Sequence, residues 1–273
     1  MTAQTTAPQQ KKSPPWRSLL SQLDGLGILA WGVLLLKYFF TGELKLLIHP
    51  NYFALVGVTG LVLLFLGGIR TVQTVEHWLR RSPNQAEDTV THVTVLPLGL
   101  GSLLLLLTAI AGLVITPTVF SSQLALQRGI SNTLSPTQVQ TKSFAGGSQN
   151  PEERTLVDWI RTINAYPEPD VYAGQKADFS GFVVYPDYLP DNYFLIGRFI
   201  LTCCAVDAYP IALPVKLSGS REQYPQDSWL QIQGEMISET FPVASGETKR
   251  QVVLEAKTLE TIPTPPDPYS YAE

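Results

Sequence analysis

Histidine and cysteine are scarce in this chain, which has three histidines and two cysteines among 273 residues. His49, His77 and His92 are far apart and match no metal-ligand spacing, so we interpret them as solvated or interfacial side chains. The sequence also contains no glycine-rich phosphate loop, no Ser-His-Asp constellation and no Cys-x-x-Cys dithiol. No pair of carboxylates stands out as an acid–base cleft. We therefore expect that this protein is not an enzyme.

Basic residues are too few to form a surface for nucleic acid. The net charge is −4, with +3 on residues 1–120 and −7 on residues 121–273. Nucleic-acid affinity comes largely from lysine and arginine that neutralise phosphates. The acidic second half therefore argues against a nucleic-acid partner.

Long apolar runs are confined to the first half of the chain. Three segments approach the roughly 20 residues that a helix needs to cross a bilayer, namely Leu23–Phe40, Tyr52–Ile69 and Val95–Val119. Lys37 lies near one end of the first segment, where its stem can reach the headgroups. Small residues in the second and third segments predict close helix packing; they are Gly57, Gly60, Gly67, Gly68, Gly99, Gly101, Ala109, Ala111 and Gly112. We expect a three-helix transmembrane domain over residues 23–120.

The basic residues of the short loops predict an orientation. Lys11, Lys12 and Arg17 precede the first segment, and Arg70, Arg80 and Arg81 follow the second. The loop after the first segment offers only Lys45 and His49, and no basic residue follows the third until Arg128. By the positive-inside rule, residues 1–22 form a cytoplasmic tail. An odd number of spans then puts the C-terminal half outside the cytoplasm.

A polar connection and an amphipathic helix follow the membrane part. Residues 121–149 are rich in Ser, Thr, Gln and Gly and are expected to form a linker. Asn150 is a plausible N-cap, followed by Pro151 at the first helical position. The next apolar residues recur at helical spacing and predict a face that docks on the following domain or on a partner; they are Leu156, Trp159, Ile160 and Ile163.

The remaining sequence is typical of a small β domain over residues 150–261. Five runs rich in aromatic and β-branched residues predict strands at 176–185, 193–202, 211–217, 229–237 and 250–261. Gly181 and Gly234 would ease bending, so we expect a closed barrel of the OB type, with an open sandwich as the alternative. The Pro- and Tyr-rich tail, residues 262–273, is expected to lie extended on the surface.

Both cysteines stand together in this domain. Cys203 and Cys204 come at the end of the second predicted strand, where alternate side chains point to opposite faces, so a turn is needed before both reach one ion. Such a turn would gather Arg198, Cys203, Cys204 and Asp207 at one corner. There Arg198 would lower the pKa of a thiol, and Asp207 could supply an oxygen ligand or accept the arginine fork.

Three interpretations of this corner stay open. The thiolates and Asp207 could bind a thiophilic metal ion or do thiol chemistry, although two Cys and one Asp do not complete a zinc set, so a partner would supply the rest. The cysteines could instead be small buried residues beside a structural Arg198–Asp207 pair. The third interpretation is a disulfide between Cys203 and Cys204. It would be strained, because disulfides favour Cα atoms about 4.4–6.8 Å apart and neighbouring residues are about 3.8 Å apart.

Several of these features together resemble a known family. The three-helix head, the segment Pro117–Gly129, the phrase Phe179–Val184 and above all the stretch Gly197–Ala208 are similar to the YcgQ-like family of bacterial permease subunits. The Arg-x4-Cys-Cys-x2-Asp-Ala pattern within that stretch is fairly specific. The resemblance implies a bacterial cytoplasmic (inner) membrane protein that works beside a larger, multi-span permease.

We carry three functional hypotheses from the sequence. The first is an accessory permease subunit whose external domain receives, gates or delivers a solute, with a thiophilic metal ion as one candidate. The second is a membrane-anchored thiol oxidoreductase that uses Cys203 and Cys204. The third is a structural anchor or assembly factor. We favour the first, because three spans without an acid or base near mid-membrane are too few for a transport path and imply a partner.

Overall fold

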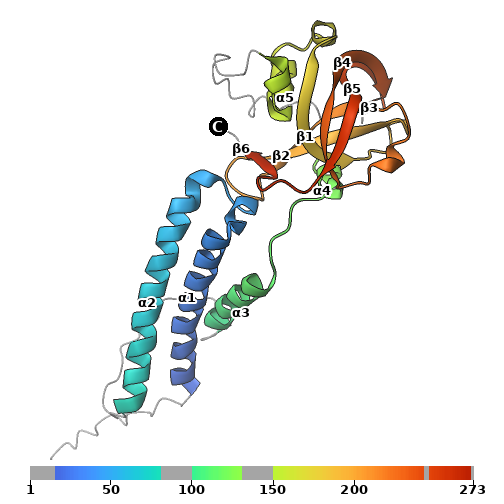
Figure 1. Cartoon of the computed structure of the whole chain (residues 1–273). Helices are drawn as coiled ribbons and strands as arrows, with labels where there is room; N and C mark the ends of the chain where they lie inside the picture. The colour runs from blue at the N-terminus through green and yellow to red at the C-terminus, as the bar shows by residue number, and fades with distance from the viewer. Residues whose placement is uncertain (1–15, 81–99, 131–149, 243–245, 272–273) are drawn as a thin grey trace, which may run out of the picture. The chain divides into compact units, whose positions relative to one another are not determined.

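The structure is a computed structural model, and it describes residues 16–80, 100–130, 150–242 and 246–271 (Figure 1). The chain divides into two compact units, one of residues 1–44 and 50–117, the other of residues 45–49 and 118–273. Residues 1–15 of the expected tail, His92, and residues 131–149 of the expected linker lie outside the described residues.

The first unit is helical. It contains α1 (Trp16–Thr41), the short 3-10 turns η1 (Glu43–Leu46, which ends in the other unit) and η2 (Pro50–Tyr52), α2 (Phe53–Arg80) and α3 (Leu100–Val114). Among the described residues, two stretches are long and apolar enough to cross a membrane, Leu23–Thr41 and Pro50–Glu76. This length and composition are consistent with membrane association.

The third expected span ends earlier than predicted. Its described part, α3, has 15 residues and ends at Val114. Its last helical hydrogen bond runs from the Ile115 N–H to the Ala111 carbonyl, 2.8 Å. Pro117 disfavours helical backbone at the residue before it, which explains why the helix stops short of Val119. Residues 95–99 of the expected span lie outside the described part.

Glycines set the packing of the helices, as the sequence predicted for some positions and not for others. A Cβ added at Gly67 would lie 2.8 Å from the Leu29 side chain, and one at Gly60 would lie 2.9 Å from Leu36. Only glycine permits so close an approach. A Cβ at Gly68 would meet nothing within 4 Å, so the expectation was wrong there.

α3 also packs on α1 through polar contacts at the end of the pair. The Tyr38 hydroxyl donates to the Gly112 carbonyl at 2.5 Å, and Lys37 Nζ donates to the Leu113 carbonyl at 3.3 Å. Lys37 also lies 3.8 Å from a carboxylate oxygen of Glu43. These contacts account for a lysine so close to an apolar segment.

The second unit is built on six strands within its described residues (Figure 1). They are β1 (Lys176–Val184), β2 (Tyr193–Leu201), β3 (Tyr209–Lys216), β4 (Trp229–Pro242), β5 (Thr248–Ile262) and β6 (Tyr269–Tyr271). The five expected strands are all present. β6 lies in the tail that we expected to be merely extended, and it pairs in parallel with β2.

The first five strands close into a ring. Their order is β1-β4-β5-β3-β2, and β2 pairs again with β1. The neighbours are antiparallel except β3 and β5, which are parallel. A Cβ at Gly181 would lie 2.6 Å from the Gly197 carbonyl oxygen, and one at Gly234, beside a bulge, would lie 2.2 Å from that of Glu255. These glycines allow the backbones to meet where the sheet bends.

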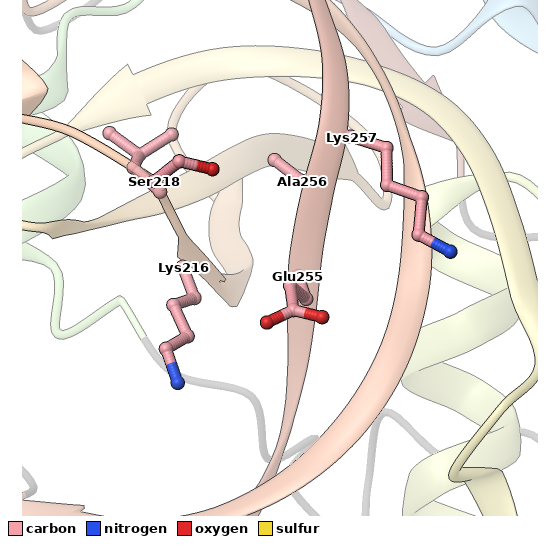
Figure 2. A pocket seen from close by; sticks show the side chains of 6 residues that line it. Lys216, Ser218, Glu255, Ala256 and Lys257 are labelled. Carbon is pink, nitrogen blue, oxygen red and sulfur yellow. The ribbon is translucent and has the colours of Figure 1, made fainter.

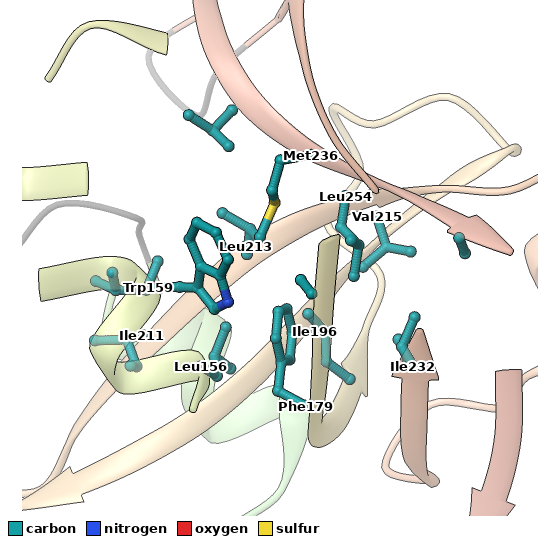
Figure 3. Close-up of a cluster of buried hydrophobic side chains, with 14 of the residues drawn as sticks. Leu156, Trp159, Phe179, Ile196, Ile211, Leu213, Val215, Ile232, Met236 and Leu254 are labelled. Atoms are coloured by element: carbon teal, nitrogen blue, oxygen red, sulfur yellow. The ribbon is translucent and has the colours of Figure 1, made fainter. Parts of the chain in front are cut away.

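The interior of the ring is apolar, and α5 (Leu156–Ala165) packs against the same cluster (Figure 3). Trp159 and Ile160 are fully buried there, which confirms the predicted apolar stripe. The start of the helix differs from the prediction. Thr155 caps α5 in a reciprocal pair with Asp158, whereas Asn150 caps the separate 3-10 turn η3 (Pro151–Glu153). Thr155 can form the complete capping box, which explains the later start.

The first part of the expected linker packs into a second apolar cluster of the β domain. Residues 122–127 form a helix, α4 (Ser122–Gln127), in which Ala125 is fully buried, and Ile130 is also buried. Both belong to a cluster with Phe199 and Tyr269, and the Phe120 ring lies 5.1 Å from the Tyr269 ring. Residues 121–130 are therefore part of the β domain. A short apolar segment in a polar stretch carries too little periodicity to reveal such docking.

Candidate metal and thiol site

The cysteines lie in the loop between β2 and β3, and Asp207 determines the shape of that loop. Its carboxylate accepts hydrogen bonds from the backbone N–H groups of Thr202 (3.3 Å), Cys203 (2.8 Å) and Cys204 (3.2 Å). The Asp207 N–H in turn donates to the Cys204 carbonyl at 3.2 Å. Backbone donors that leave a strand need new acceptors, and a short acidic side chain supplies them here.

This turn breaks the strand alternation and brings the two thiols together. Cys203 is exposed and Cys204 is half-buried, and no disulfide joins them. Their sulfur atoms are 3.7 Å apart. One ligand atom from each of Cys203, Cys204 and Asp207 lies within 4.8 Å of the other two. The structure therefore gathers three of the four residues that the sequence proposed for this corner.

The electrostatics of the loop keep Cys203 protonated. The hydrogen bond to Asp207, followed by the contact with Cys204, raises the pKa of Cys203 to about 12. Burial alone would raise the pKa of Asp207, but the hydrogen bonds from the Cys203 thiol and the three backbone N–H groups lower it. The expectation that Arg198 would lower the pKa of a thiol is wrong for Cys203.

Arg198, the fourth predicted residue, contacts another part of the domain. It lies within β2, and its Nη2 donates to the Asp267 carbonyl at 2.7 Å. Its guanidinium carbon is 5.7 Å from the centre of the Trp229 ring. Asp267 also forms an ion pair with Lys45 at 2.9 Å. These contacts fasten the segment before β6.

A segment from the first half of the chain borders the thiol loop, which the sequence did not indicate. The Ala205 N–H donates to the Leu47 carbonyl at 2.7 Å, and the His49 N–H donates to the Cys203 carbonyl at 3.0 Å. Ile48 and Cys204 form an antiparallel bridge. His49 is only 6% exposed, so the solvated alternative of our expectation is wrong for it. No local pattern could have revealed this pairing across some 155 residues.

Arg128 is another contact that sequence reasoning missed. It follows α4, and its Nη1 donates to the carbonyl oxygens of Ala205 (3.3 Å) and Ala208. Its guanidinium carbon is 5.3 Å from the centre of the Phe120 ring. The far side of the thiol loop is thereby held to the segment that we had expected to be a linker.

A hollow between the end of β3 and the middle of β5 is a weaker candidate (Figure 2). It is lined by Lys216, Leu217, Ser218, Glu255, Ala256 and Lys257. Two lysines could attract an anion, but each already forms an ion pair, Lys216 with Glu239 and Lys257 with Glu235. The hollow therefore offers little uncompensated charge, and we give it no functional role.

Comparison with known proteins identifies the β domain. No curated protein matches the chain. Residues 137–272 match a family model described as the DUF1980 C-terminal domain. The matched region contains all six described strands, α5 and the thiol loop. Residues 137–272 are thus similar to the DUF1980 C-terminal domain, a family of YcgQ-like bacterial proteins.

Proposed function

We propose that this protein is the accessory subunit of a multi-span membrane permease and that its β domain receives and hands over a solute outside the cytoplasm. The observation that carries the proposal is the exposed loop on which one ligand atom from each of Cys203, Cys204 and Asp207 lies within 4.8 Å of the others. Such a loop can exchange a bound species with a partner, because its ligands stand at the surface rather than in a closed core.

The exposed apolar side chains of the membrane helices are a second argument for a partner protein. Leu55, Leu61 and Phe65 on α2 are among many large apolar side chains that are more than half exposed. Lipid or another membrane protein would cover such a surface. The described parts of α1 and α2 place no acidic or basic residue near the middle of either apolar stretch. A transport path normally needs polar groups at that depth, so we assign the path to the permease.

The contacts of the thiol loop support a topology with three crossings. Leu47–His49 follows the first apolar helix in the chain and hydrogen-bonds to Cys203 and Ala205, so both segments belong on one side of the membrane. The chain between them must then cross an even number of times. We propose that α2 and the longer segment ending in α3 make these two crossings. In a bacterial inner membrane, a cytoplasmic N-terminus then puts the β domain outside the cytoplasm.

The strand order supports the OB-like assignment. The ring runs β1-β2-β3-β5-β4 and back to β1, as in the five-stranded Greek-key barrel of OB folds. An OB-like barrel hosts many functions, so the fold alone does not select the solute. We rest the function on the thiol loop.

Purification of the tagged full chain in mild detergent, followed by mass spectrometry, tests the proposal. A multi-span permease should co-purify in a fixed ratio with the wild-type chain and with a Cys203→Ser, Cys204→Ser double variant. The loop is proposed to act on the solute and not on assembly. A mixed disulfide partner lost in the double variant would support the thiol-oxidoreductase alternative instead. A partner with no transport role would support the structural anchor.

A further inference from the structure

The spacing of the two sulfur atoms constrains what the thiol loop can bind. They are 3.7 Å apart. Two thiolates at about 2.3 Å from a tetrahedral zinc ion are about 3.8 Å apart, whereas a linear site at that bond length needs about 4.6 Å. The loop therefore presents its sulfurs at the separation of a tetrahedral edge without rearrangement.

The third ligand points to the same class of ion. A carboxylate oxygen of Asp207 belongs to the same 4.8 Å cluster, and zinc accepts oxygen ligands at about 2.0–2.2 Å beside thiolates. Cu(I) favours soft sulfur donors, and Mg²⁺ or Ca²⁺ favours all-oxygen sites. From the geometry we infer that Cys203, Cys204 and Asp207 bind one thiophilic divalent cation of the zinc class and leave its fourth position open.

The surroundings preorganise these ligands. The Asp207 carboxylate is oriented by the hydrogen bonds that it accepts from three backbone N–H groups. The loop is held on one side by Leu47–His49 and on the other by Arg128. Such supporting contacts fix ligand geometry and raise metal affinity. The loop can thus receive an ion with little loss of conformational freedom.

The binding step balances without an oxidant or reductant. The cation replaces the two thiol hydrogens, both of which leave to solvent as protons, and gains two sulfur bonds and one oxygen bond. Two thiolates and one carboxylate leave a net charge of −1 on the occupied site. Water or a ligand from a partner can take the fourth position, because Cys203 is exposed.

This inference deepens the proposed function and rests on it only for the statement that the ion is the solute of the permease. The binding itself is a property of this chain. If zinc binds to the purified chain and no permease co-purifies, the function fails and the site stands. If a permease co-purifies and zinc does not bind, the site fails and the function stands.

The test is a titration of the reduced, metal-free full chain in detergent with Zn²⁺, in competition with a chromophoric chelator. We expect one ion per chain, and Cd²⁺ should produce a thiolate-to-metal absorption band. Cys203→Ser and Cys204→Ser should each weaken binding by more than about 100-fold, and Asp207→Asn by about 10–100-fold with the cadmium band retained. Asp187→Asn, which removes an exposed carboxylate from another loop, is the matched control and should bind as the wild type.

Melting temperatures and circular dichroism of each variant separate lost ligands from lost folding. Wild-type affinity in the double cysteine variant, or in a folded Asp207→Asn chain, would overturn the site. Binding of Cu(I) without binding of Zn²⁺ would overturn the assignment of the ion class.

Discussion

Asp207 accepts the backbone N–H of Cys203 at 2.8 Å, so the carboxylate that stands beside the thiols also holds the backbone that carries them. A single acidic residue thereby links the conformation of the loop to the chemistry of its sulfurs. Arg198, which the sequence placed beside Asp207, contacts Asp267 and Trp229. These contacts of Arg198 lead to a direct test.

Arg198→Lys should lower stability without changing metal affinity. Lysine keeps the charge but loses the planar group that donates to Asp267 and faces Trp229. We expect a loss of about 1 kcal/mol in the free energy of unfolding, measured by urea denaturation, and an unchanged zinc titration. A weakened titration at unchanged stability would instead return Arg198 to the site.

The β domain should need residues 118–130 to reach full stability. Ala125 and Ile130 are buried in its second apolar cluster, so a fragment that begins at Asn150 exposes that cluster. We expect a fragment of residues 118–273 to melt cooperatively at a higher temperature than residues 150–273. Ile130→Ala should cost about 2–4 kcal/mol, whereas Leu126→Ala, at a more exposed position in the preceding helix α4, should cost under about 1 kcal/mol. Equal melting of the two fragments would restore the longer linker.

Stability should fall between pH 10 and 12, partly through Tyr193. Burial, then the hydrogen bond to Glu239, raises the pKa of Tyr193 from 10.0 to about 12. The folded state holds this proton more tightly, so the contribution is fully present below pH 10 and is lost as the pH rises through 12. Tyr193→Phe should flatten the fall, as measured by denaturation at pH 9, 10 and 11. Part of the fall should remain in Tyr193→Phe, because the hydrogen bond to Glu239 also raises the pKa of Lys216. An identical slope in the variant would contradict this role of Tyr193.

Gly67 and Gly68 form a matched pair for the packing of α1 and α2. A side chain at Gly67 would meet Leu29 at 2.8 Å, whereas one at Gly68 would meet nothing within 4 Å. Gly67→Val should destabilise the helix pair by about 1–3 kcal/mol, seen as a lower melting temperature in detergent. Gly68→Val should leave it nearly unchanged. Equal effects of the two variants would mean that these helices pack differently in the membrane.

The proposed topology predicts that Cys203 reacts from outside the cell membrane. A membrane-impermeant maleimide should label intact spheroplasts after mild reduction, because Cys203 is exposed. Its raised pKa makes the reaction slow at neutral pH and faster at alkaline pH, since the thiolate is the nucleophile. The double Cys→Ser variant gives the background. Labelling that requires broken membranes would place the β domain in the cytoplasm.

The sequence alone determined the elements whose signal is local. Runs rich in aromatic and β-branched residues marked β1 to β5, and the helical spacing of Leu156, Trp159 and Ile160 marked α5. Gly181 and Gly234 marked the bends because only glycine permits the close backbone approach seen there. Two long apolar runs marked α1 and α2. Each of these patterns lies within one segment, so no knowledge of distant partners was needed.

Only the tertiary structure decided the contacts between distant segments. It paired Leu47–His49 with the thiol loop, docked α4 on the β domain, added β6 beside β2, and turned Arg198 toward Asp267. Hydrogen bonds between backbone groups do not depend on which side chains are present, so the sequence does not predict them. An alanine such as Ala125 also occurs in linkers as well as in cores, so its identity does not predict burial. The cysteines were visible from the start, but their shared direction came from a turn that depends on three backbone bonds to Asp207.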